Sequence, residues 1–176
     1  VVLVGIDNYA DPQIHSRRHA EADAAALYDL FTSKDHLGLD PKNVKLLLGK
    51  ADQKRQAQSA THENVLKALQ WLSKTARKDD LVIFAFFGNG APLGERNCYC
   101  TVDSTFKDRG KNALAAAEIE GALDNLQSQR FVVFLDCNFM GFKQDKGQTL
   151  EPNFTNFYRE FLGNEEGPKS VVPSRV

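Results

Sequence analysis

The sequence predicts an α/β fold, a three-layer sandwich in which helices cover both faces of a mainly parallel sheet. Apolar runs alternate with segments of helical period along the chain, which is typical of successive βαβ units. These apolar runs are continuous rather than alternating, as expected for strands covered by helices on both faces. A chain of 176 residues is expected to form one domain, residues 1–176.

The spacing of apolar residues and the positions of turn residues predict the secondary-structure elements in order along the chain. Strands are expected at 1–6, 44–48, 81–87 and 131–137, with a short edge hairpin at 98–102. The strand at 81–87 is expected to stop at Gly88, because two glycines and Pro92 follow it. Residues 53–60 are polar and are expected to form a loop. Residues with helical apolar period predict helices at 20–32, 115–126 and 153–162, and another helix that starts after Thr61 as its N-cap. A short apolar segment is expected at 171–172.

Composition excludes several classes of function. Hydrophobic residues make up 42% and charged residues 26%, and a net charge of -1 argues against a nucleic-acid partner held through phosphates. No apolar stretch reaches the ~18 residues of a membrane span. The three cysteines, Cys98, Cys100 and Cys137, fit neither a disulfide framework nor a zinc site, so we expect reduced thiols, no metal, and a cytoplasmic location. Because the chain opens on a strand without an initiator methionine, we expect it to be excised from a longer protein with further domains.

Two loops at the expected strand ends carry an asparagine each. The first reads Gly88-Asn89-Gly90, and the second contains Asn138 two positions after Asp136. The carboxyl ends of parallel strands are where doubly wound sheets bind ligands. A turn is the simplest interpretation of Gly-Asn-Gly alone. A phosphate loop is disfavoured because no helix opens after it, which also counts against the alternative of a flavodoxin-like cofactor binder, so no cofactor is expected.

The second loop changes this interpretation, because Asn138 follows Asn89 by 49 positions. A separation of ~50 residues is that of the histidine and cysteine of caspase-type peptidases. The chain resembles the caspase and metacaspase family of cysteine peptidases over about 1–141. Its opening strand through Tyr9 and the following helix are similar to the family's, Phe87 to Gly90 matches a Ser-Gly-His-Gly motif, and Asp136 to Gly141 matches an Asp-x-Cys-His-Ser-Gly motif. The resemblance implies a caspase-like fold whose last strands, from a small subunit, begin about where this chain ends.

The departures from the family fall on its catalytic residues. Asn89 stands at the position of the catalytic histidine and Asn138 at that of the nucleophilic cysteine, while Phe139 and Met140 replace the next two motif residues. Asparagine neither takes a proton at neutral pH nor attacks a carbonyl. The resemblance therefore implies a degenerate, inactive member that acts as a binding, scaffolding or regulatory module.

Cys137 is the alternative nucleophile of an active cysteine endopeptidase with an unidentified base. Strand alternation turns its side chain away from the face of Asn138, so a packing role is favoured over a catalytic one. Asp136 and Asp103 resemble the acidic residues with which metacaspases bind a basic side chain, although either could instead be a strand-end residue bonded to backbone. Arg17 and Arg18 are expected to be solvated surface.

The partners expected on these grounds are a peptide or protein with a basic side chain and the other domains of a longer parent protein. The sheet edge after Val172 is unpaired, completed by further sequence, or paired with a second chain to form a homodimer.

Overall fold

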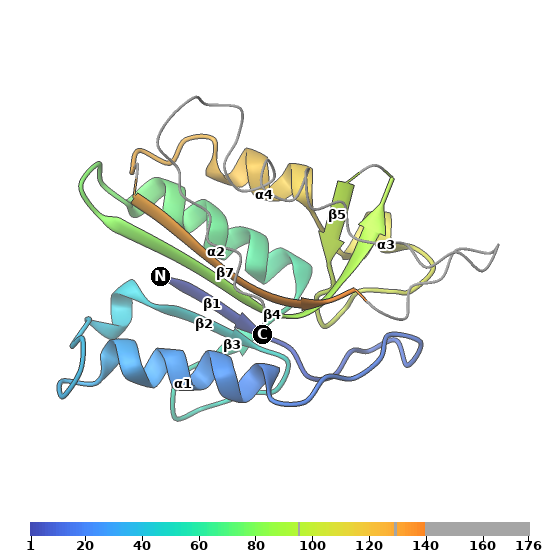
Figure 1. Ribbon diagram of the computed structural model, residues 1–176, viewed down its shortest axis with the longest axis horizontal. Coiled ribbons are helices and arrows are strands. Elements are labelled where there is room, and N and C mark those ends of the chain that lie inside the picture. The colour runs from blue at the N-terminus through green and yellow to red at the C-terminus, as the bar shows by residue number, and fades with distance from the viewer. Residues whose placement is uncertain (95, 129, 140–176) are drawn as a thin grey trace.

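The computed structural model describes residues 1–94, 96–128 and 130–139 and confirms the predicted α/β fold (Figure 1). Helix α1 covers one face of a parallel sheet, and α2 and α4 cover the other. Within these residues the parallel sheet has the order β3 (Gln58–Ser59), β2 (Lys45–Leu48), β1 (Val2–Gly5), β4 (Leu81–Leu93) and β7 (Arg130–Asn138). The described helices are α1 (Ala20–Thr32), α2 (His62–Thr75), α3 (Arg109–Asn112) and α4 (Ala116–Leu123), and a 3₁₀ turn lies at Pro41–Asn43.

Helices α1, α2 and α4 begin close to their predicted positions, but α4 ends at Leu123 rather than at 126, and the short helix α3 was not predicted. Helix α1 has the predicted bounds, and the chain turns into it directly beneath β1, where a Cβ on Gly5 would lie 2.5 Å from the carbonyl oxygen of Ala20. Helix α2 starts after Thr61, whose side chain accepts a hydrogen bond from the backbone N–H of Asn64. None of the helices in the described ranges is long and apolar enough to cross a membrane.

The prediction that the third apolar strand stops at Gly88 was wrong. β4 continues to Leu93, and its last residues leave the parallel sheet to pair antiparallel with β5 (Arg96–Tyr99), which in turn pairs with β6 (Leu114–Ala115). Among the described residues, Pro92 pairs with β5 on one side only, as proline does at sheet edges. The two glycines are part of the extended strand that passes from one sheet to the other.

Four smaller predictions differ from the structure or lie outside the described residues. The expected loop at 53–60 contains the two-residue strand β3, which pairs with β2. The expected hairpin at 98–102 is β5, which begins and ends earlier. The predicted helix at 153–162 and the apolar segment at 171–172 lie outside the described residues.

Strand β7 is covered on one face only by the residues that the structure describes. Its odd-numbered side chains, Phe131, Val133, Leu135 and Cys137, pack against the core beneath α2 and α4. On the α1 side, Val132 and Phe134 are 37% and 47% exposed. The expectation of a strand buried on both faces therefore fails here, because α1 lies over β1, β2 and β4 and leaves β7 beside it.

Candidate functional site

The two asparagines lie opposite each other where the parallel pairing of β4 with β7 ends. β4 and β7 run parallel, and Asn89 and Asn138 are the last matched pair of their ladder. Neighbouring strands are about 4.8 Å apart, so these two residues are direct neighbours. Both share the face of Phe87 and Asp136, the face on which α1 packs. The structure thus brings together the two positions that the sequence singled out.

Asn89 is buried and connects β4 to the loop between β1 and α1. Its side chain is 2% exposed, and Nδ2 donates a hydrogen bond of 2.6 Å to the carbonyl oxygen of His15. Its backbone N–H donates to the hydroxyl of Tyr9 at 2.8 Å, and its carbonyl accepts from the N–H of Cys100 at 2.8 Å. Among the described residues, the buried Oδ1 has no hydrogen-bond donor. The Asn89 side chain therefore serves as a donor that holds the loop.

Aromatic rings fill the opposite face of the same strand end. A Cβ on Gly88 would lie 2.9 Å from the ring of Phe86 and 3.1 Å from the hydroxyl of Tyr9. A Cβ on Gly90 would lie 2.5 Å from the ring of Phe139. Burial raises the pKa of the Tyr9 phenol, which keeps it protonated at neutral pH. Both glycines are thus needed for close packing of rings against the strand, in addition to any turn preference.

Arg17 lies across the end of the parallel β4–β7 pairing, contrary to the prediction that it is solvated surface. Its Nη1 donates to the carbonyl oxygens of Gly88 at 2.8 Å and Asp136 at 2.7 Å. Its Nη2 donates to Oδ2 of Asp136 at 2.9 Å. The Arg17 side chain is 18% exposed and that of Asp136 is 56% exposed. The loop before α1 starts at the sheet edge where Asn89 and Asn138 lie. In the sequence, only this shared location could have indicated the contact.

Asp103 has a different set of partners from Asp136. Its Oδ1 accepts from the backbone N–H of His62 at 2.9 Å and from the hydroxyl of Thr101 at 2.7 Å. It therefore caps the first turn of α2, on the face of the sheet opposite to α1. The described contacts do not join the two carboxylates in one site, and Asp103 takes the backbone-bonded role that the sequence left open.

The arrangement of strands, loops and strand-end motifs agrees with one family. A family model described as Caspase domain matches residues 1–171 of this chain. The chain belongs to the caspase-domain family of peptidases. This match confirms the family resemblance found in the sequence and the predicted caspase-like α/β fold.

Individual relatives of this caspase domain match over shorter stretches. Metacaspase-1 of Debaryomyces hansenii is 44% identical over 55 residues, which cover 31% of this chain and 12% of that protein. A crystal structure of a protein from Geobacter sulfurreducens superposes with a TM-score of 0.56 at 18% identity, covering 77% of this chain and 48% of that one. The chain thus spans about half of the solved relative and a small part of the curated one, and the structural likeness concerns the fold.

Cys137 of this caspase domain lies in the layer beneath α2 and α4. It packs against the core cluster that contains Phe84, Phe86 and Tyr99, on the face of β7 opposite to Asn138. His15, beside Asn89, is exposed and contributes its backbone carbonyl rather than its ring. Cys98 and Cys100 are buried in a separate apolar cluster, where burial raises the pKa of the Cys100 thiol.

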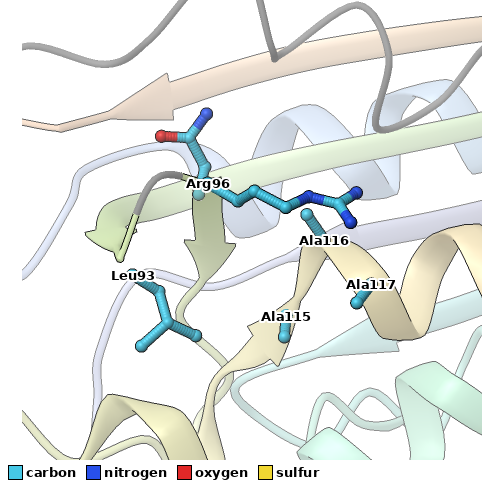
Figure 2. Close-up of a pocket in the computed structure, with 6 residues that line it drawn as sticks. Leu93, Arg96, Ala115, Ala116 and Ala117 are labelled. Atoms are coloured by element: carbon cyan, nitrogen blue, oxygen red, sulfur yellow. The ribbon is translucent and has the colours of Figure 1, made fainter.

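The caspase domain has a cavity of about 400 Å³ whose described lining includes neither Asn89 nor Asn138 (Figure 2). It lies between the β4–β5 turn and the start of α4, and Ala115, Ala116 and Ala117 form one wall. The guanidinium of Arg96 at this cavity is paired with Glu120 at 2.9 Å. In the described part of the chain, no group of three or more His, Cys, Asp or Glu side chains is placed to hold a metal ion.

The described groups at the strand ends are polar and form hydrogen bonds. The site offers one exposed carboxylate, one guanidinium, two carboxamides and the carbonyl groups of two strand ends. These groups donate and accept hydrogen bonds, and the carboxamides do not titrate in the physiological range.

Proposed function

We propose that this caspase domain has no peptidase activity and acts as a binding module, in a scaffolding or regulatory role within a larger protein. The observation that supports it best is the pairing of Asn89 with Asn138 at the strand ends, where the family resemblance places histidine and cysteine. A carboxamide cannot serve as the general base, and it cannot replace a thiolate as the nucleophile.

The cost of losing both groups is large. In the serine peptidase subtilisin, removing the nucleophile or the base alone costs about as much as removing the whole triad, a factor of about 10⁶ in kcat. The Asn89 side chain is also 2% exposed and already bonded to the carbonyl of His15, so it is not directed at a substrate. What remains at the site is its shape and its hydrogen-bonding groups.

Asp136 is the group on which binding of a partner would centre. Its side chain is 56% exposed at the carboxyl end of β7, next to Asn138. A carboxylate in this position favours a basic side chain through charge-assisted hydrogen bonds. The proposed partner is therefore a peptide segment or protein that presents a lysine or arginine. Asp103, engaged at the start of α2, is left out of this proposal.

Peptidase assays test the proposed inactivity. The purified domain is incubated with fluorogenic peptides ending in Arg, Lys or Asp, and no turnover above the buffer blank is expected. Turnover that is lost in Asn138→Ala or Asn89→Ala would refute the proposal. Turnover lost only in Cys137→Ser would instead support an active enzyme that uses Cys137.

Restoring the family residues is the complementary experiment. Asn89→His combined with Asn138→Cys is expected to add one thiol that iodoacetamide alkylates faster than the three native cysteines, because a neighbouring imidazole promotes the thiolate. Asn138→Ser in the Asn89→His background is the matched control, because it adds no thiol. Equal alkylation of both double variants would show that the strand-end position is closed to small molecules.

A further inference from the structure

Three oxygen atoms converge on the guanidinium of Arg17. Two are backbone carbonyls at neighbouring strand ends, those of Gly88 and Asp136, and the third is Oδ2 of Asp136. Carbonyl oxygens and a carboxylate form a site for a cation, and three acceptors match the three donors of an ammonium group as well as two nitrogens of a guanidinium. The site is thus built for a basic side chain, and the chain itself supplies one.

We propose that Arg17 is an internal occupant of the Asp136 site, so that a basic side chain of a partner binds only by displacing the Arg17 guanidinium. This proposal rests on the binding function proposed above and adds its regulation. Arg17 uses Oδ2 of Asp136 and both nearby carbonyls, which are the acceptors that a bound lysine or arginine would need. A second cation placed on the same three oxygen atoms would lie beside the Arg17 guanidinium, and like charges at close range repel.

The backbone around Arg17 is held in place, which limits how the site opens. The N–H of Arg17 donates to the carbonyl oxygen of Asp7 at 2.8 Å. Two residues earlier, the carbonyl of His15 accepts from Asn89 at 2.6 Å. Displacement therefore requires rotation of the Arg17 side chain rather than opening of the loop. Arg18, the next residue, is exposed and provides a matched control.

Occupancy by Arg17 lowers the apparent affinity for a basic ligand. The measured dissociation constant is the intrinsic one divided by the fraction of molecules in which the site is open. If Arg17 occupies the site in about nine molecules of ten, its removal increases the affinity about tenfold. The gain is specific to basic ligands, because only they compete for Oδ2 of Asp136.

Fluorescence anisotropy with a fluorescein-labelled tetrapeptide ending in arginine amide tests the proposal. Arg17→Gln is expected to bind this peptide about tenfold more tightly than the unaltered domain or Arg18→Gln. The same peptide ending in glutamine amide is expected to show no gain. Adding Asp136→Asn to Arg17→Gln is expected to remove the gain. Equal binding by Arg17→Gln and Arg18→Gln, a gain that survives Asp136→Asn, or no binding by any variant would overturn the proposal.

Arg17→Lys provides a second variant if Arg17→Gln does not fold, as judged by circular dichroism. The lysine keeps the charge but loses the fork that binds two strand ends, so a smaller gain of the same sign is expected. No gain in Arg17→Lys would overturn the proposal in that case. The peptidase assays test a separate claim. Turnover by the unaltered domain would refute the proposed inactivity, whereas an affinity gain in Arg17→Gln would still support the displacement of Arg17.

Discussion

Replacing Asn89 by aspartate tests whether its buried amide holds the loop before α1. Asn89→Asp keeps the size of the side chain but exchanges the Nδ2 donor for an oxygen. An ionised carboxylate has no hydrogen to donate, so it would face the carbonyl oxygen of His15 at 2.6 Å as a second acceptor. Only the protonated acid restores the donor. Because the position is also 2% exposed, the folded state favours the neutral form and raises the pKa of the introduced carboxyl.

The sign and size of the effect follow from this raised pKa. With a rise of about two to three units above the unfolded value of about 3.9, stability is retained below about pH 4 and lost as the pH rises through the folded-state pKa. At about 1.4 kcal/mol per unit, Asn89→Asp is expected to lose roughly 3–4 kcal/mol relative to the unaltered domain at about pH 7.5. At about pH 4 the loss is expected to be below roughly 1 kcal/mol.

Urea denaturation at these two pH values measures the difference directly. Asn138→Asp is the matched control, because that position is only half-buried, and its loss is expected to be small at both pH values. If Asn89→Asp is as stable as the unaltered domain at about pH 7.5, the Asn89 amide does not support the loop. A loss of equal size at both pH values would indicate a packing defect rather than a buried charge.

Two further predictions concern stability. Gly5→Ala is expected to destabilise the domain by about 1–3 kcal/mol in urea denaturation, because the new Cβ would meet the backbone of Ala20. The control Gly121→Ala, which has open space in α4, is expected to stabilise the domain by about 0.5–1 kcal/mol. Equal effects of the two substitutions would contradict the close packing of α1 on β1. Asp103→Ala removes the acceptor for the N–H of His62 and is expected to lower the free energy of unfolding by about 1 kcal/mol without changing the affinity for an arginine peptide. A change in that affinity would return Asp103 to the binding site.

The fold was largely predictable because its signals are local. The helix at 20–32 and the cap at Thr61 depend on apolar period and on one hydroxyl, both of which are visible in a short window. The continuation of β4 beyond Gly88 was not predictable in the same way. Glycine and proline favour a turn locally, but pairing with β5 and packing under Phe139 outweigh that preference.

The residues of the candidate site also differ in how far the sequence could predict their positions. Asn89 and Asn138 could be placed at adjacent strand ends from the order of strands and their 49-residue separation. Arg17 could not, because its partners lie 71 and 119 positions away and its own segment reads as a polar loop. The partners of Asp103 could not be read from its position along the chain either. Its place after β5 resembles a site position, but its carboxylate meets the start of α2.

The contacts of Arg17 and Asn89 together explain how the strand ends keep their shape without catalytic groups. Each residue joins the loop before α1 to the part of β4 where its pairing with β7 ends, through Gly88 in one case and His15 in the other. Arg17 also reaches β7, so the three segments that converge at this edge are connected by side chains with defined partners. The Asn89 contact is buried and independent of any ligand, whereas the Arg17 contact ends on a half-exposed carboxylate. Of the two, only the second can be exchanged for an external cation while the loop stays in place.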